Sequence, residues 1–222
     1  MKLTKTLYAY VWENPFENNC NSYYLGGTVQ ALVDPGLSAH LPALLSKMEE
    51  DGIHCDNIRY VISTHSHPDH FEGCRRWNGV SSVTLGLGSE ELDFYESEGC
   101  MLYRYFGIDA PDVKINLKLR EGTVMLGDEP IEVIDVPGHS PGSIALYWPS
   151  EKALIPGDVI FEGNVGRTDF PGGSADELKK SIQKLSFVDA EYLLPGHIGL
   201  VKGFRSIRDN FRFVMDRIFP YL

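Results

Sequence analysis

Cysteine is scarce in this chain of 222 residues, which contains four of them. They lie far apart and form no C-x-x-C pair, at positions Cys20, Cys55, Cys74 and Cys100. Their spacing disfavours both a zinc finger and a disulfide framework, and it predicts free thiols.

Basic charge and long apolar runs are also scarce. The chain has 20 Lys and Arg residues against 31 Asp and Glu residues, a formal net charge of −11. Because nucleic-acid binding relies on Lys and Arg surfaces, this balance predicts no nucleic-acid partner. The segment Met1 to Lys5 is followed by no apolar signal region, and no apolar run approaches membrane-spanning length. We therefore expect a cytoplasmic protein with no membrane partner.

Repeats, low-complexity tracts and interdomain linkers are absent from the sequence. The 43% hydrophobic and 23% charged content is ordinary for a globular protein, and 222 residues suffice to bury a full core. We expect a single domain over residues 1–222.

Histidine, in contrast, is concentrated. The stretch Thr64-His65-Ser66-His67-Pro68-Asp69-His70 holds three of the seven histidines together with an aspartate. It follows the apolar run 58–62, which predicts a buried strand that delivers these side chains to one point. Imidazole and carboxylate are ligands of borderline divalent cations. A His-rich surface turn is the alternative, but three of seven histidines in one turn favour a metal site.

Three further strand ends repeat this layout, because a Pro-Gly pair and a ligand residue follow each of the apolar runs 131–134, 153–155 and 193–194. Gly allows tight backbone paths near a ligand, and Pro stiffens them. The four strand ends together offer seven candidate metal ligands: His65, His67, Asp69, His70, His139, Asp158 and His197. A lone His after a strand is more often structural, but the repeated layout favours one shared site.

Hydrophobic periodicity predicts the elements around these ligands. The N-terminal part predicts an antiparallel start, with strands over 7–12, 22–25 and 29–33, and then a helix over Leu41 to Met48. A second helix opens at the capping pair Ser174 and Glu177, and a C-terminal helix covers about 203–219. The C-terminal helix has a basic outer face, so membrane contact is an alternative to packing on the core, which we favour.

The motif order T-H-x-H-x-D-H, P-G-H-S-P-G-S, G-D and P-G-H, from about Asn19 to His197, resembles the metallo-β-lactamase-fold hydrolases. The loop 166–174 is similar to that of the hydroxyacylglutathione hydrolase (glyoxalase II)-like branch, and also to that of the persulfide dioxygenases. The resemblance implies an α/β fold, the four-layer αβ/βα sandwich of two mixed β-sheets flanked by helices, with metals at one edge.

The resemblance also implies the chemistry. Two divalent metal ions, zinc by preference and otherwise iron or manganese, would be held by His65, His67 and His139 and by Asp69, His70 and His197, with Asp158 between them. A bridging hydroxide, oriented by Asp69 as the catalytic residue, would attack a small acyl thioester such as S-lactoylglutathione. A thiolate leaves easily, so no general acid is needed.

Two other functions stay open. A persulfide dioxygenase would hold one iron on His67, His139 and Asp158. A non-catalytic metal-binding domain would not need all seven ligands. A β-lactam substrate is disfavoured, because the best-known β-lactamases have Cys at the place of Asp158. Only residues 198–222 follow His197, enough for about one helix, so the glutathione-binding residues of the C-terminal extension in larger glyoxalase II enzymes cannot be carried over.

Two carboxylates and one aromatic segment complete the predicted site. Asp34 and Asp169 are predicted to accept the second N–H of a ligand imidazole, with helix capping or loop stapling as the alternative. A helical insertion over about 86–112 is rich in aromatics: Phe94, Tyr95, Tyr103, Tyr105 and Phe106. These side chains would cap the active site, form a homodimer contact or pack inward.

Overall fold

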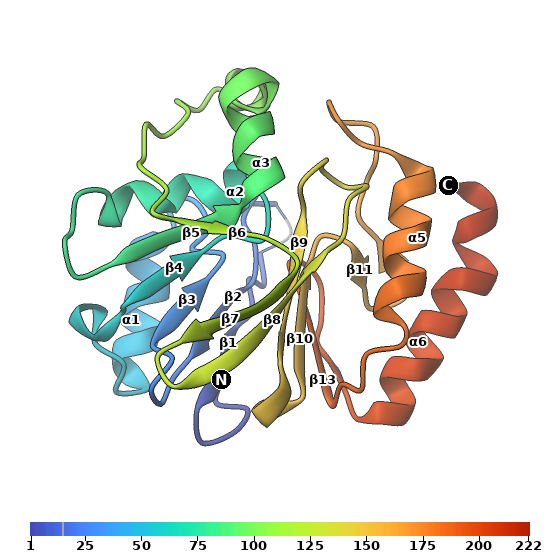
Figure 1. The fold of residues 1–222 in the computed structure, drawn as a ribbon, viewed down its shortest axis with the longest axis horizontal. Coiled ribbons are helices and arrows are strands. Elements are labelled where there is room, and N and C mark those ends of the chain that lie inside the picture. The colour runs from blue at the N-terminus through green and yellow to red at the C-terminus, as the bar shows by residue number, and fades with distance from the viewer. Residues whose placement is uncertain (15) are drawn as a thin grey trace.

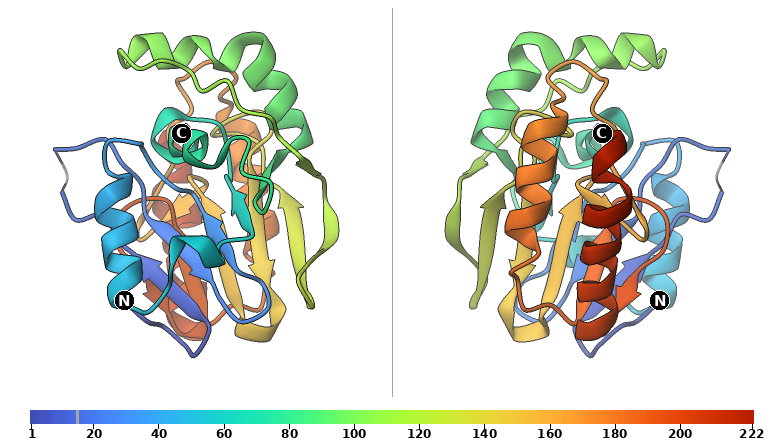
Figure 2. Two further views of the ribbon diagram at one scale, coloured as in Figure 1. Left: turned by 90° about the vertical axis from the view of Figure 1, so that its left-hand side faces the viewer. Right: turned by 90° about the vertical axis from the view of Figure 1, so that its right-hand side faces the viewer.

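The computed structural model describes residues 1–14 and 16–222, which form four layers. Two mixed β-sheets lie face to face, and helices cover the outer face of each (Figure 1). The side views in Figure 2 show the two long C-terminal helices side by side over the second sheet. This arrangement confirms the fold that the sequence resemblance implies, an αβ/βα sandwich.

The first sheet contains the N-terminal half of the chain. Its six strands are hydrogen-bonded in sequence order: β1 (Leu7–Tyr10), β2 (Ser22–Leu25), β3 (Ala31–Val33), β4 (Tyr60–Ile62), β5 (Thr84–Gly88) and β6 (Leu117–Leu119). The pairs β1–β2 and β2–β3 are antiparallel, as the sequence predicts, whereas β3 to β6 are parallel. The predicted strand 29–33 begins only at Ala31, because Gln30 has a left-handed backbone with φ 51°.

The second sheet is mostly antiparallel. Its spatial order is β14 (Val201–Lys202), β13 (Tyr192–Pro195), β10 (Ala153–Gly157), β9 (Ile144–Trp148), β8 (Glu129–Asp135) and β7 (Gly122–Leu126). The pair β10–β13 is parallel, so these two strands end at the same edge. A short hairpin, β11 (Ile160–Phe161) and β12 (Asn164–Val165), follows β10.

Four helices belong to the first half and two to the second: α1 (Leu41–Glu50), α2 (Pro68–Phe71), α3 (Ser89–Phe94) and α4 (Met101–Tyr105), then α5 (Ala175–Leu185) and α6 (Phe204–Arg217). Helix α5 begins as predicted, since the Ser174 hydroxyl accepts from the Glu177 N–H at 3.4 Å. The predicted insertion 86–112 contains the end of β5, α3, a π-helical turn over Tyr95–Gly99 and α4.

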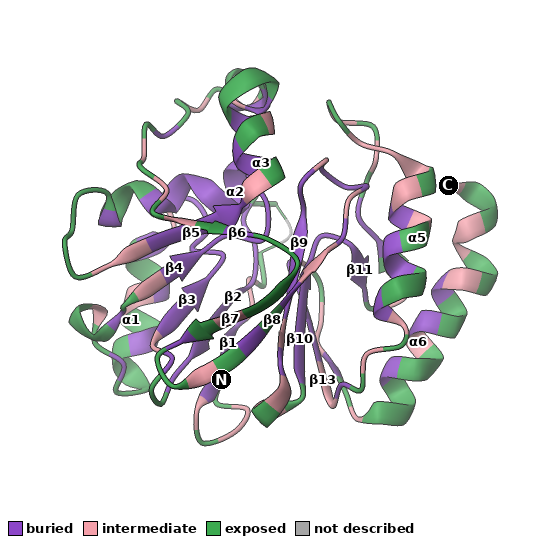
Figure 3. Ribbon diagram, in the orientation of Figure 1, coloured by how far each residue is buried: buried purple, intermediate pink, exposed green. Residues whose placement is uncertain are grey.

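Three apolar clusters fill the three spaces between the four layers. The central cluster joins both sheets, with Tyr23 and Ile62 from the first and Leu146 and Leu194 from the second. A second cluster packs α1 and the 86–112 insertion on the first sheet, and a third packs α5 and α6 on the second. Figure 3 shows that most strands are buried, that β7 and β8 at the edge of the second sheet are partly exposed, and that α5 and α6 carry exposed residues.

Helix α6 packs on the core and not outward. Its apolar residues Ile207, Phe211 and Val214 are at most 2% exposed and lie in the cluster with α5 and the second sheet. In the part of the chain that the structure describes, we find no helix with the length and hydropathy needed to cross a membrane.

Helix α6 offers a matched test of this packing. Phe211 is 2% exposed, whereas Phe213, two positions along the same helix, is 48% exposed. We expect Phe211→Ala to lower the free energy of unfolding by about 3–5 kcal/mol, because a cavity replaces a buried ring. Phe213→Ala should change it by less than about 0.5 kcal/mol. Urea titration followed by circular dichroism measures both, and equal losses would contradict the placement of α6.

Candidate metal centre

The seven predicted ligands lie together at one edge of the sandwich, where strands from both sheets end. His65 and His67 follow β4, and Asp69 and His70 stand on the short helix α2. His139 lies between β8 and β9, while Asp158 and His197 follow the parallel strands β10 and β13. The two sheets thus bring together residues up to 132 positions apart in the sequence, since His65 and His197 belong to one cluster.

Two groups of three ligand residues share no member, and a third group, His65, His70 and Asp158, links them. The first contains His65, His67 and His139, the second contains Asp69, His70 and His197, and the atoms within each group are at most 4.8 Å apart. Asp158 lies between the groups: its Oδ2 is 3.5 Å from His139 Nε2 and 3.2 Å from His197 Nε2, and its Oδ1 is 3.2 Å from His70 Nε2. This is the place that a bridging carboxylate would take.

The first group is deeply buried, and the Nε2 atoms of its rings lack hydrogen-bond partners. His65, His67 and His139 are 0%, 4% and 2% exposed. Among the described residues, none makes a hydrogen bond to the Nε2 atom of these three rings. A buried polar atom without a partner costs about 1–3 kcal/mol, so three at one point need an explanation. A metal ion held by the three nitrogens supplies one, and the residues present therefore fit a metal.

The tautomers of two of these rings follow from their other nitrogens. His139 Nδ1 lies 2.7 Å from the carbonyl oxygen of Arg167, which can only accept, so Nδ1 carries the proton. His65 Nδ1 lies 3.1 Å from the Thr64 hydroxyl, which itself donates to Asp34 at 2.9 Å. In both rings the free lone pair is left on Nε2, which faces the other ligands.

Protonation differs between the two groups. Burial, helped by the neighbouring imidazoles, lowers the pKa of His67 to about 3 and that of His65 well below its usual value, so both are neutral at pH 7. Burial also lowers the pKa of His197, but Asp158 and Asp69 outweigh it and raise this pKa to about 10. In the second group, the carboxylates of Asp69 and Asp158 thus stabilise positive charge.

Asp34 takes the position that the sequence predicts for it. It follows β3, is fully buried, and its Oδ2 lies 3.0 Å from His70 Nδ1. Its other oxygen accepts from the Thr64 N–H at 2.8 Å. Asp34 thereby contacts one ligand ring directly and supports His65 through Thr64.

Asp169 does not contact a ligand imidazole and takes the alternative predicted role, the stapling of its own loop. Its side chain is 67% exposed and forms a two-pronged pair with Arg167, with both N–O distances at 2.6 Å. The Arg167 carbonyl, and not a side chain of this loop, accepts from the Nδ1–H of His139. The acceptor is a backbone atom, so the sequence carries no side-chain signal for it.

Backbone packing brings His197 to the cluster. A Cβ on Gly196 would lie 2.2 Å from Asp158 Oδ1 and 2.5 Å from His70 Cε1, so only glycine fits before His197. Asn21 fixes the same turn by donating to the carbonyls of Pro195 and Ile198 at 2.9 and 3.1 Å. Neither the Asn21 contact nor its role follows from a local motif.

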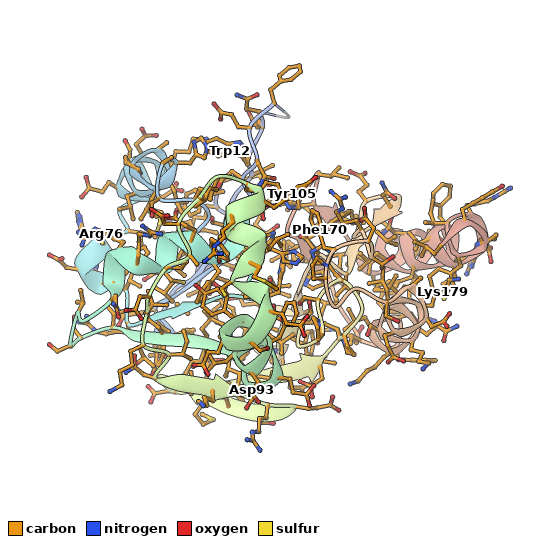
Figure 4. The ribbon with its side chains drawn as sticks, turned by 90° about the horizontal axis from the view of Figure 1, so that it is seen from above. Trp12, Arg76, Asp93, Tyr105, Phe170 and Lys179 are labelled. Carbon is orange, nitrogen blue, oxygen red and sulfur yellow. The ribbon has the colours of Figure 1, made fainter. Side chains whose placement is uncertain are left out.

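A cavity of about 310 Å³ opens onto the ligands, lined by Asn18, His67, Asp69, Phe106, His139, Asp158, Phe161, Val165, Gly166, Arg167, Phe170 and His197. Phe170 lies 5.5 Å from the His67 ring and 5.9 Å from Phe106, and the Arg167 guanidinium lies 3.8 Å over its face. In Figure 4, which views the molecule from above, Tyr105 and Phe170 lie near each other, with their ring centroids 6.5 Å apart.

The aromatic residues of the insertion divide between two of the three predicted roles. Tyr103 is fully buried and Tyr95 is 9% exposed, so both pack inward. Phe106 lines the cavity, as expected of a residue that caps the site. Tyr105 is 80% exposed, and its part in a homodimer contact stays a prediction.

Comparison with known proteins agrees with this geometry. Residues 15–197 match the metallo-beta-lactamase superfamily. The chain is 32% identical to a hydroxyacylglutathione hydrolase of Haemophilus influenzae, over 82% of this chain and 86% of that protein. It is 30% identical to a probable metallo-hydrolase of Methanocaldococcus jannaschii, over 83% and 90%.

Solved structures are similar over nearly the whole chain. A B3 metallo-beta-lactamase has a TM-score of 0.74 at 25% identity and covers 95% of this chain and 97% of its own. A protein solved in a di-iron-bound form has a TM-score of 0.72 at 27% identity, with 96% and 98% covered. With its fold, its clustered ligands and a family match over residues 15–197, the chain belongs to the metallo-beta-lactamase superfamily.

Proposed function

We propose that this protein is a metal-dependent hydrolase that cleaves a small acyl thioester. The observation that carries the proposal is the pair of ligand groups that share Asp158, with three buried Nε2 atoms that lack partners. The ligand types suit zinc, and they also accept iron or manganese. The similarity to a hydroxyacylglutathione hydrolase supports a thioester as the substrate class.

Two bound divalent ions would supply a Lewis acid for the scissile carbonyl and a water of lowered pKa. The residues of the chain hold and orient this site. Asp69 Oδ2 lies 3.3 Å from His197 Nε2 and faces the cavity, so it can both complete the second ligand group and align the attacking water. The Arg167 carbonyl orients the His139 ring through a hydrogen bond, and the Asp34 carboxylate lies 3.0 Å from Nδ1 of His70.

The cavity favours a small substrate. Phe106, Phe161 and Phe170 form an apolar wall that would exclude water around an acyl group. None of the lining residues comes from the segment after His197, and α6 packs on the second sheet. Recognition of a thiol carrier such as glutathione therefore falls to residues at the mouth, among them Asn18 and Arg167.

Metal content gives the first test. We expect purified protein to bind two divalent ions per chain, and His139→Ala to retain one, because it removes one of three ligands of the first group. The control His54→Ala changes an exposed histidine far from the cluster and should retain both. Elemental analysis after dialysis measures the stoichiometry. Equal metal content in the two variants would contradict the ligand assignment.

Turnover by Asp69→Ala gives the second test. Because displacement of a reacting atom by about 1 Å can cost about a hundredfold, we expect thioester hydrolysis to fall by at least that factor. Asp109→Ala, at an exposed position, is the control and should keep its activity. Hydrolysis of S-lactoylglutathione and of simpler thioesters measures both.

The same assays separate the alternatives. Near-wild-type thioesterase activity in Asp69→Ala would refute the two-metal mechanism. Iron-loaded protein that consumes oxygen with a persulfide, and hydrolyses no thioester, would establish the dioxygenase instead. A chromogenic β-lactam belongs in the substrate panel because a B3 metallo-beta-lactamase is among the similar structures.

A further inference from the structure

A buried glutamate joins the two loops that carry the first ligand group. Glu91, on α3, is 0% exposed, and its carboxylate accepts four hydrogen bonds. Oε1 accepts from the Ser66 N–H at 2.8 Å and the Ser66 hydroxyl at 2.6 Å. Oε2 accepts from the Ser140 hydroxyl at 2.7 Å and the Gly142 N–H at 2.9 Å. Oε1 thus binds the loop that contains Ser66, and Oε2 binds the loop that contains Ser140 and Gly142.

The two loops are those of the three histidines. Ser66 stands between His65 and His67, and Ser140 directly follows His139. The backbone of α3 packs tightly against the His139 loop, because a Cβ on Gly142 would lie 2.0 Å from the Glu91 backbone nitrogen. Tyr103, on α4 of the same insertion, donates to the Ser66 carbonyl at 2.8 Å. The insertion therefore holds the His65–His67 loop from two sides.

The second ligand group has other supports. His70 is in contact with Asp34, and the turn of His197 is held by Asn21. Asp69 pairs with His197 itself. The hydrogen bonds of the Glu91 carboxylate go to the first group's loops alone among the described residues.

We propose that Glu91 is a positioning residue for the first metal ion, acting through Ser66 and Ser140 to hold the His65–His67 loop and the His139 loop at the separation that ion requires. This inference rests on the proposed function in one respect, that the site binds metal. Hydrogen bonds to a buried carboxylate are among the strong ones, and ligand groups must be held within about 0.5 Å of their binding geometry. Loss of an outer partner of metal ligands weakens binding about 10- to 100-fold.

Glu91→Gln tests the proposal with little change of volume. Its amide replaces one acceptor oxygen with an NH₂ group, which then faces the N–H of either Ser66 or Gly142. One backbone donor loses its acceptor in either orientation. The matched control is Glu90→Gln, which makes the same change at the preceding, exposed position of α3.

The measurement is titration of metal-free protein with Co²⁺ and with Zn²⁺ against a chromophoric chelator. We expect wild type and Glu90→Gln to bind two ions alike. Glu91→Gln should bind one ion with wild-type affinity and the other about 10- to 100-fold more weakly. The Co²⁺ absorption spectrum of Glu91→Gln with one ion bound should match that of His139→Ala and differ from that of His197→Ala, which identifies the weakened group.

Other outcomes overturn the proposal. Two wild-type affinities in Glu91→Gln would show that the glutamate does not position the ion, and equal weakening of both ions with a lower Tm would show a merely structural role. If Glu91→Gln fails to fold, Ser140→Ala, which removes one of the four donors, should weaken the binding of the same ion by a smaller factor. Unchanged affinities in Ser140→Ala would refute the inference.

Wild type that binds two ions but hydrolyses no thioester would refute the proposed function and leave this inference standing. Wild type that binds no ion would refute both.

Discussion

The structure depends on one constraint, that seven polar side chains are brought together and mostly buried at the edge where two sheets meet. Imidazole nitrogens without partners and closely spaced carboxylates are costly away from water. Three Nε2 atoms face a common point in one group, and the carboxylates of Asp69 and Asp158 stabilise positive charge in the other. Bound cations would satisfy both the unpaired nitrogens and the carboxylates, so the arrangement fits metal ions.

The sandwich is suited to hold such a site because strand ends are rigid. The central apolar cluster locks the two sheets together, and the parallel pairs β3–β4 and β10–β13 direct their carboxyl ends to the same edge. The loops at that edge are held in place by contacts between residues that are far apart in the sequence. Asp34 supports His65 and His70, the Arg167 carbonyl orients His139, and Glu91 joins the His65–His67 loop to the His139 loop.

Residues around the candidate ligands shape the cavity and support the ligand loops. The 86–112 insertion supplies Glu91 and Tyr103 beneath the site and Phe106 at its mouth. The loop 166–174 supplies Phe170 to the cavity wall and keeps Arg167 beside it through Asp169. These parts line a small cavity in which Phe106 and Phe170 stand beside polar candidate ligands.

The sequence by itself predicted the candidate ligand residues and the fold, because the His-x-His-x-Asp-His cluster and the repeated Pro-Gly turns are local patterns, and hydrophobic periodicity reports burial. The sequence also indicated where helix α5 begins, that Asp34 lies near the ligands, and that one face of α6 packs on the core. Tertiary structure alone decided the rest. Glu91 looks in sequence like one more acid among Glu90, Glu91 and Asp93, and the acceptor of His139 is a backbone carbonyl. Asp169 was assigned the wrong partner for the same physical reason: a hydrogen bond between distant segments depends on separations of a few ångströms that only the packed layers set.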